Sequence, residues 1–412
     1  MNEKLRVDSE KIIQAAIEGV KPDQAVCKAI KEMKFKGNVY LVAVGKAAWQ
    51  MAKAAVENLT YPLKQGIVVT KYNHVKGDIK GVCCYEGGHP IPDEGSFKGT
   101  QAILDMTKNL EPDDTVLFLL SGGGSSLFEN PKIQAEELQD ITRQLLACGA
   151  DIKEINTIRK RLSMVKGGRF AQWCSPANVK AVVLSDVLGD QLDMIASGPV
   201  TKDLSTSEQS INILKKYHLK MSEQAIACIR EETPKKLVNV QIEIIGSVRE
   251  LCNQAMIKCK ELGYETHFLT HHLDCEAKEA GIFLADILLS HERAGKSLAF
   301  IAGGETVVHL TGNGLGGRNQ ELALSAARKI AGLRNVAIFS VGSDGTDGPT
   351  NAAGGYVDGD TLETLKEQGI LIDDVLNEND SYSALKKSDG LIITGATGTN
   401  VNDLAVALLY KE

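Results

Sequence analysis

Four aspartates follow two apolar runs that are expected to form buried strands. LSDVLGDQLD places Asp186 and Asp190 after one run, and GSDGTDGPT places Asp344 and Asp347 in the equivalent position in the second half of the chain. Carboxylates on loops at strand ends are hard oxygen ligands suited to Mg²⁺, and one of them could accept a proton from a substrate hydroxyl. Either pair could instead cap a helix or shape an Asx turn. We take Asp186 and Asp190 as candidate metal ligands and all four as candidate binding residues.

A loop rich in glycine and serine, SGGGSSLFENP, follows another strand-like run at its carboxyl end. Glycines let the backbone approach a ligand closely, and serine hydroxyls can donate hydrogen bonds to its oxygens. A nucleophilic serine would need a positioned histidine and a G-x-S-x-G elbow, and this loop has neither. We therefore expect ligand binding rather than covalent catalysis from Ser121, Gly122, Gly123, Gly124, Ser125 and Ser126.

Two further side chains are candidates for contact with an anion. Lys46 follows Gly45 at the start of a helix, directly after the run VYLVAV, so its ammonium can fold toward a ligand at the strand end. The segment is no Walker A loop, because the preceding glycine is missing and Ala47 stands where Ser or Thr is required. His89, in GGHPIPDEGS, is either a ligand contact or a structural histidine. A solvated lysine is the ordinary alternative for Lys46.

The segment GNGLGGRNQE contains a literal G-x-G-x-x-G, but it does not open a first βαβ unit and lacks the acidic residue about 20 positions further on, so dinucleotide binding is disfavoured. We interpret it as a loop leading into a helix whose first N–H groups can bind an anion. Arg318 in the first turn would add bidentate contacts to a phosphate or carboxylate, with Asn319 beside it. A surface loop with a solvated arginine is the alternative.

Composition restricts the classes to which this protein can belong. The 412 residues suggest two domains, and 43% hydrophobic with 24% charged residues is ordinary for a globular protein. A net charge of −7 without a Lys/Arg stripe argues against nucleic-acid binding, and the apolar runs are shorter than the roughly 18 residues of a membrane span. The N-terminal segment is too polar for a signal peptide, so a cytoplasmic location is expected. Nine cysteines without a C-x-x-C fit neither a disulfide framework nor a zinc site.

The elements that must position these residues have the pattern of a parallel α/β protein. Short β-branched runs end in Gly- or Asp-rich loops and precede helical periodicity, as at 39–48, 66–71, 115–126, 179–190, 298–306, 335–348 and 390–400. A charged helical stretch ends near residue 236, and a new strand-like run begins near 240. We therefore expect domains at 1–236 and 237–412. Glycine-rich loops in both halves predict one set from each domain facing a shared cleft.

The blocks VAVGKAA, GGHPIPDEGS, LLSGGGSS, NTIRKRLSMVKGGR, LSDVLGD, IASGP, GGETVV, GGRNQE and SDGTDGPT, in this order, resemble the glycerate 2-kinases. The resemblance implies a Rossmann-like parallel-sheet N-terminal domain and a smaller α/β C-terminal domain with the MOFRL region at about 295–405. It also implies an active site in the interdomain cleft. The implied activity is ATP- and Mg²⁺-dependent phosphorylation of D-glycerate on its 2-hydroxyl.

By the same resemblance Lys46, Asp186 and Arg318 are the catalytic residues, and Gly304 and Glu305 of GGETVV join the binding residues. Lys46 and Arg318 would neutralise phosphoryl charge, while Asp186 would orient the metal or take the proton of the hydroxyl.

One position departs from the family pattern, which commonly reads DGPTDAAG, because Asn351 stands here in place of the aspartate and cannot act as a base. The rival hypotheses are an NAD(P)-dependent hydroxypyruvate reductase and a non-catalytic sugar-acid-binding protein. The expected partners are D-glycerate and ATP, with no nucleic acid and no membrane, and a homodimer stays open.

Overall fold

The computed structural model describes residues 2–185 and 192–411, which form two compact units. One unit comprises residues 22–245, and the other comprises residues 1–21 together with 246–412. This division differs from the expected domains in two ways: the boundary lies at 245/246, and the first 21 residues belong with the C-terminal unit. Among the described residues no helix is long and apolar enough to cross a membrane.

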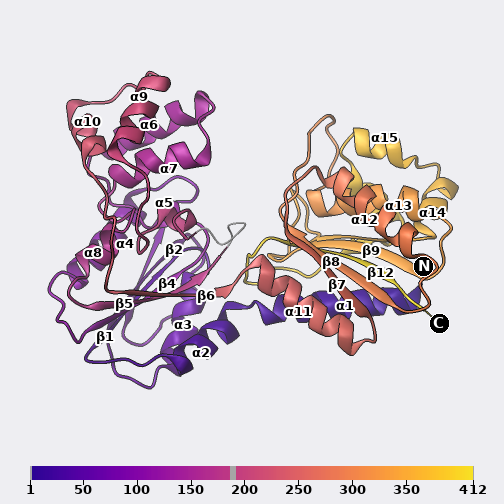
Figure 1. Ribbon diagram of the computed structural model, residues 1–412, viewed down its shortest axis with the longest axis horizontal. Helices are drawn as coiled ribbons and strands as arrows, with labels where there is room; N and C mark the ends of the chain where they lie inside the picture. The colour runs from indigo at the N-terminus through magenta and orange to yellow at the C-terminus, as the bar shows by residue number, and fades with distance from the viewer. Residues whose placement is uncertain (1, 186–191, 412) are drawn as a thin grey trace. The chain divides into compact units, whose positions relative to one another are not determined.

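The unit of residues 22–245 is built on a sheet of six strands among its described residues, in the order β3-β2-β1-β4-β5-β6 (Figure 1). The pairings of β3 with β2, β2 with β1, β1 with β4 and β4 with β5 are parallel, as predicted. Strands β1 and β4 are almost completely buried, because helices cover both faces. The strands are β1 (Val39–Val44), β2 (Leu63–Lys71), β3 (Val82–Gly87), β4 (Thr115–Leu120), β5 (Asn178–Leu184) and β6 (Val240–Gly246).

The helices of this unit fall into two groups. Helices α2 and α3 lie on one face of the sheet and α4, α5 and α8 on the other, while α6, α7, α9 and α10 form a separate helical layer with its own apolar core (Figure 1). The short 3-10 helix η2 packs against α5 and α7. The helices are α2 (Pro22–Glu32), α3 (Ala48–Asn58), α4 (Glu94–Met106), α5 (Gly124–Leu127), α6 (Ala135–Ala147), α7 (Ile152–Arg161), α8 (Arg169–Trp173), η2 (Ile195–Ser197), α9 (Ser207–Lys216) and α10 (Glu223–Arg230).

The second unit carries a mixed sheet, which corrects the expectation of parallel strands in the C-terminal half. Its order is β11-β10-β9-β12-β8-β7, and only the β7–β8 pair is parallel among the described pairings. The reason is that β12 returns antiparallel between β8 and β9. The strands are β7 (Glu265–Leu273), β8 (Leu298–Gly304), β9 (Val336–Gly342), β10 (Gly354–Asp358), β11 (Leu391–Ile392) and β12 (Asp403–Leu409).

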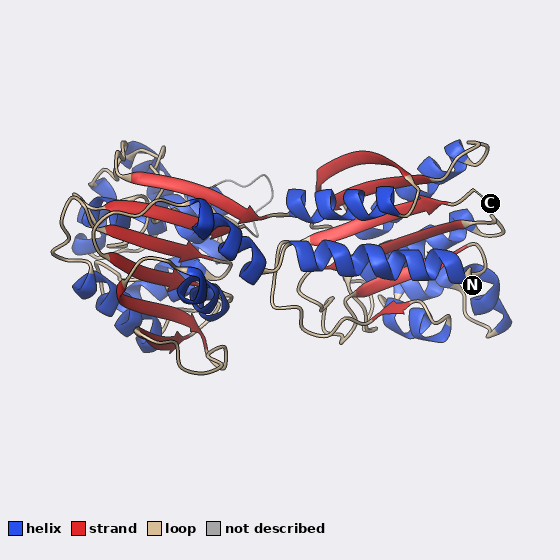
Figure 2. Cartoon of the chain, turned by 90° about the horizontal axis from the view of Figure 1, so that it is seen from below, coloured by secondary structure: helices blue, strands red, loops and turns tan. Residues whose placement is uncertain are grey.

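Helices cover both faces of this mixed sheet as well, as Figure 2 shows from below. Helices α1 and α11 pack together on one face, and α12 and α13 on the other (Figure 1). The buried Asp8 of α1 accepts a hydrogen bond of 2.7 Å from the hydroxyl of Tyr264, which ties the N-terminus to this unit. The helices are α1 (Glu3–Gly19), α11 (Val248–Glu261), α12 (Ala277–His291), α13 (Arg318–Ile330), α14 (Thr361–Glu367), α15 (Ile372–Asn377) and α16 (Ser381–Lys387).

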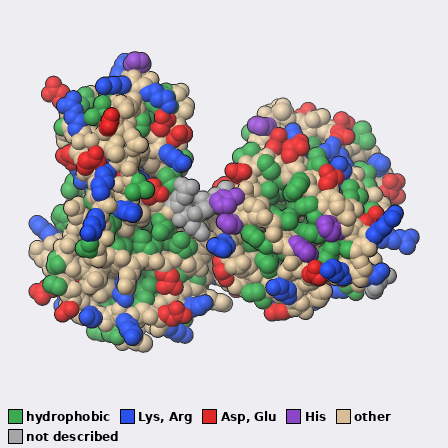
Figure 3. Space-filling view, viewed as in Figure 1, with side chains coloured by type: hydrophobic (Ala, Val, Ile, Leu, Met, Phe, Trp, Pro, Cys, Tyr) green, Lys and Arg blue, Asp and Glu red, His purple; other side chains and the backbone are tan. Residues whose placement is uncertain are grey.

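The surface carries charges of both signs. Over the face drawn in Figure 3, Lys and Arg side chains alternate with Asp and Glu and do not gather by sign. Local groups must therefore supply any strongly positive site.

Candidate functional site

The loops that follow β1 and β4 are bonded to each other at the carboxyl edge of the first sheet. The backbone N–H of Lys46 donates to the carbonyl of Gly122 at 2.8 Å, and the N–H of Ala47 donates to the hydroxyl of Ser121 at 3.1 Å. Gly45 has φ +119, and a methyl group on it would lie 2.3 Å from that hydroxyl, so glycine is required there. The predicted Gly-Lys and Gly-Ser segments thus form one substructure.

Three predicted residues meet over the glycine-rich loop. A methyl group placed on Gly123 would lie 3.0 Å from Cδ2 of His89 and 3.2 Å from Cγ of Lys46, so both side chains pack against this glycine. Burial is the largest cause that lowers the pKa of His89, and the charges of Lys46, Lys71 and His74 lower it further. The lowered pKa favours the neutral form of His89, and the ammonium groups of Lys46 and Lys71 make the group as a whole a positive site that can receive an oxyanion.

Sequence reasoning did not identify Lys71 and His74. Lys71 ends β2, beside β1 in the sheet, and His74 follows three residues later, where its Nδ1 contacts the carbonyl of Lys46 at 2.9 Å. The signal for Lys71 was present, because GIVVTK ends in a lysine at a strand terminus. Asp93 was also missed; its carboxylate accepts from the N–H groups of Gly88, Gly95 and Ser96 and fixes the segment that carries His89.

Buried charged side chains hold the glycine-rich loop in place. Arg159 of α7 donates to the carbonyl of Ser125 at 2.9 Å, and Lys166 donates to the carbonyl of Phe128 at 2.7 Å. Both cations pair with Glu129, whose side chain is completely buried, as is that of Lys166. Burial lowers the pKa of Lys166 to about 8. The serines of the loop differ in their surroundings. Ser121 and Ser126 are buried, and their hydroxyls donate to the carbonyls of Val44 and Gly123, while Ser125 is half-exposed.

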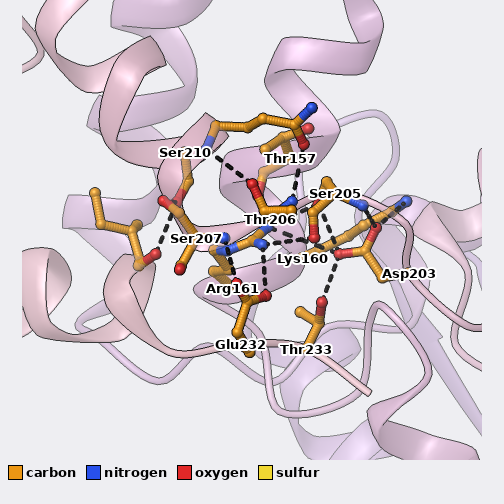
Figure 4. Close-up of polar contacts among 12 residues, drawn as sticks. Thr157, Lys160, Arg161, Asp203, Ser205, Thr206, Ser207, Ser210, Glu232 and Thr233 are labelled. Carbon is orange, nitrogen blue, oxygen red and sulfur yellow. Dashed lines mark hydrogen bonds and ion pairs between the residues drawn. The ribbon is translucent and has the colours of Figure 1, made fainter. Parts of the chain in front are cut away.

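Helix α7 is itself anchored by a buried polar network around Arg161 (Figure 4). Arg161, fully buried, donates to the hydroxyl of Ser205 at 2.8 Å and to its carbonyl at 2.9 Å. Asp203 accepts from Lys160 at 3.2 Å and from the hydroxyl of Thr233 at 2.7 Å. Charged groups at this depth require such partners, so the network fixes the end of α7 from which Arg159 reaches the loop.

Asp186 and Asp190 lie outside the described residues, so their roles remain predictions. The IASGP block that follows them is described: Ala196 packs on Gly124, where a methyl group would approach its Cβ to 2.7 Å. Ser197 donates to the side chain of Asn156 at 2.8 Å. These contacts connect the IASGP block to both the glycine-rich loop and α7.

In the second unit, Arg318 makes a two-point contact with Asp403, which was not among the predicted residues. Its Nε and Nη2 donate to the two carboxylate oxygens of Asp403 at 2.5 and 3.0 Å, and its Nη1 donates to Glu305 at 2.9 Å. Glu305 follows Gly304, the last residue of β8. The predicted Gly-Gly-Glu and Gly-Gly-Arg blocks therefore meet at the carboxyl end of β8.

The anion site expected at the start of α13 is filled by a side chain of the protein itself. Asp347 accepts from the backbone N–H groups of Asn319 and Gln320 at 3.2 and 2.9 Å and from both their side-chain amides. Asn319 also accepts from the hydroxyl of Ser340 at 2.5 Å. The geometry favours the helix-capping interpretation of Asp347, and Asn319 lies in the same buried network.

The remaining candidates of this unit have local partners. Asp344 accepts from the N–H and the hydroxyl of Thr346 in an Asx turn. Asn351 accepts from the hydroxyl of Tyr382 at 2.8 Å. A methyl group on Gly312 would lie 2.3 Å from Cα of Glu378, and one on Gly314 would lie 2.5 Å from the carbonyl oxygen of Glu378, so close backbone contact explains these two glycines.

The described residues contain no group of three or more His, Cys, Asp or Glu side chains arranged to hold a metal ion. What they offer is a positive site around Lys46 and His89 in one unit and an oriented guanidinium in the other. Both arrangements are suited to binding and stabilising phosphoryl or carboxylate oxygens.

Two family models match the chain: Domain of unknown function (DUF4147) over residues 8–230 and the MOFRL family over residues 298–403. The D-glycerate 2-kinase of Thermotoga maritima is 53% identical over 99% of this chain and 99% of its own length. A putative hydroxypyruvate reductase of Agrobacterium vitis is 36% identical over 97% of this chain and 93% of its own length. The crystal structure of the glycerate kinase from Thermotoga maritima superimposes with a TM-score of 0.96 at 53% identity, covering 99% of this chain and 100% of that one.

Proposed function

Because the chain belongs to the family of glycerate 2-kinases with DUF4147 and MOFRL domains, we propose that it transfers the γ-phosphoryl group of ATP to the 2-hydroxyl of D-glycerate. The products are 2-phosphoglycerate and ADP. The observation that carries the proposal is the packing of Lys46 and His89 against Gly123, with Lys71 contributing positive charge.

The positive site around Lys46 suits the chemistry of phosphoryl transfer. The transition state spreads negative charge over the phosphoryl oxygens, and enzymes accelerate it mainly by positioning and electrostatic stabilisation. In the proposal the Lys46 ammonium neutralises that charge. Neutral His89 and the backbone of the glycine-rich loop orient the substrate oxyanions.

Arg318 is proposed as the second cation. A guanidinium can bind two phosphoryl oxygens at once, whereas a lysine acts as a point charge. Lys46 and Arg318 belong to different compact units, and the prediction that both face a shared cleft stays a prediction. The proposal requires that loss of either one lowers kcat strongly.

Asp186 is proposed to draw the proton from the glycerate hydroxyl or to orient Mg²⁺, with Asp190 as a second oxygen ligand. The position of both aspartates after a strand-like run supports the metal-ligand role, and the resemblance supports the role of Asp186. Mg²⁺ would neutralise phosphate charge in the ATP complex. A cytoplasmic location belongs to the same proposal, because ATP is the phosphoryl donor.

The test supplies D-glycerate, ATP, Mg²⁺ and enolase without phosphoglycerate mutase, so that only 2-phosphoglycerate proceeds to phosphoenolpyruvate. Absorbance of phosphoenolpyruvate should rise in proportion to the kinase added. ADP without phosphoenolpyruvate would place the phosphoryl group elsewhere. No ADP, together with NADH- or NADPH-dependent reduction of hydroxypyruvate, would establish the rival reductase.

We expect Lys46→Met to lower kcat in this assay by about 100-fold or more, because the variant removes a charge that acts on the transition state. Lys53→Met is the matched control: Lys53 is exposed on the adjoining helix α3, and its loss should leave kcat unchanged. Both variants should unfold at the urea concentration of the unmodified protein. A Lys46→Met enzyme with a normal rate would contradict the assignment.

A further inference from the structure

The guanidinium of Arg318 is fixed by a carboxylate that is much less exposed than the arginine itself. The side chain of Asp403 is 8% exposed and that of Arg318 is 33% exposed. Both oxygens of Asp403 accept from the same edge of the guanidinium, at 2.5 Å from Nε and 3.0 Å from Nη2. A two-point contact of this kind sets the plane of the guanidinium as well as its position.

Asp403 reaches this place because of the strand order. It is the first residue of β12, which runs antiparallel between β8 and β9, and it pairs with Gly304 on one side and Gly342 on the other. The start of β12 therefore lies at the carboxyl ends of β8 and β9.

The contact leaves part of the guanidinium unused. An arginine has five N–H donors. Two donate to Asp403 and one, on Nη1, donates to Glu305, whose side chain is 46% exposed. Within the described parts of the chain, one N–H on each terminal nitrogen therefore has no acceptor.

We propose that Asp403 is a positioning residue for phosphoryl transfer, which holds Arg318 so that its unused N–H groups bind the phosphoryl oxygens in the transition state. This inference rests on the proposed kinase function. Asp403 itself touches neither substrate and acts through Arg318. A buried carboxylate that fixes the orientation of a catalytic cation lowers the reorganisation needed during the reaction.

Because Asp403 can gain a proton, the inference predicts that kcat depends on pH. Burial raises the pKa of Asp403 to about 6, although hydrogen bonds and the charge of Arg318 oppose the rise. The charged groups around it are Arg318 on α13, Glu305 after β8, and Asp344 and Asp347 after β9. As the pH falls through about 6, Asp403 becomes protonated and its hold on Arg318 weakens, so kcat should fall.

Protonation of Asp403 does not itself destabilise the folded state. Because the pKa of Asp403 is higher in the folded protein than its ordinary value, the folded state binds this proton more readily than the unfolded chain. Between about pH 4 and 6 this group therefore favours the folded state as the pH decreases. A fall in kcat with retained structure is the expected signature.

The test compares Asp403→Asn with Asp373→Asn in the enolase-coupled assay. Asp373 pairs with Arg328, also on α13, but both side chains are far more exposed than Asp403. We expect Asp403→Asn to lower kcat about 10- to 100-fold at pH 7.5, because small displacements of a catalytic group have effects of this size. The acid limb near pH 6 should be absent from the variant, and Asp373→Asn should match the unmodified enzyme in rate and pH profile.

A double-mutant cycle separates positioning from a general structural role. In an Arg318→Ala background, Asp403→Asn should change kcat less than about twofold, because the two residues act as a unit. A further tenfold loss there, or a normal rate in Asp403→Asn alone, would overturn the inference. If Asp403→Asn does not fold, Asp403→Glu replaces it in the cycle, and a normal kcat for that variant would overturn the inference as well. Absence of phosphoenolpyruvate with the unmodified enzyme would instead refute the kinase function itself.

Discussion

Glycine is required at position 123 both by the backbone conformation and by the side chains that pack against it. Its φ of +85 lies in the left-handed region, and a methyl group there would press on His89 and Lys46. We expect Gly123→Ala to lower the free energy of unfolding by about 1–2 kcal/mol and kcat/KM at least about 10-fold. Gly149→Ala is the matched control, because Gly149 has φ +73 but nothing within 4 Å of an added methyl group. Urea unfolding and the coupled assay would measure both; equal activity losses would contradict the packing argument.

The position of helix α13 depends on Asp347, which supplies acceptors for the N–H groups of its first turn. We expect Asp347→Ala to lower the free energy of unfolding by about 2–4 kcal/mol, because it removes a cap and leaves buried donors without acceptors. Activity should fall too, since Arg318 opens this helix. Ser222→Ala removes a cap from α10, at the exposed edge of the other unit, and should cost about 1 kcal/mol without loss of activity. A stable, fully active Asp347→Ala protein would show that α13 does not need this cap.

At the scale of the whole molecule, the N-terminal helix completes the C-terminal unit. Leu5 of α1 is fully buried, and α1 packs on α11 and β9. We expect Leu5→Ala to cost about 2–5 kcal/mol and to raise amide hydrogen exchange in α11 and β9 but not in β1 and β4. Val42→Ala, at a fully buried position of β1, should produce the opposite pattern. Increased exchange in both units of the Leu5→Ala protein would contradict the division of the chain.

The sequence alone determined the features that depend on local pattern. Apolar runs followed by Gly- or Asp-rich loops predicted β1, β4, β8 and β9. They placed Lys46 and the glycine-rich loop at strand ends and Arg318 in the first turn of a helix. The ordered blocks of the glycerate 2-kinases then gave the family, and the matches over nearly the whole chain confirmed it. These inferences succeed because the periodicity of strands and loops, and short motifs, depend on residues that are contiguous in the sequence.

The tertiary structure alone decided which distant segments meet. Asp403 begins an ordinary apolar run in the sequence, and only the antiparallel insertion of β12 between β8 and β9 brings it to Arg318. Likewise the sequence left open whether Asp347 binds a ligand or caps a helix, and only the fold shows that it accepts from the first N–H groups of α13. The N-terminal helix joins a unit that otherwise begins at residue 246. Strand pairing and helix packing are set by long-range burial of apolar faces, which no local spacing specifies.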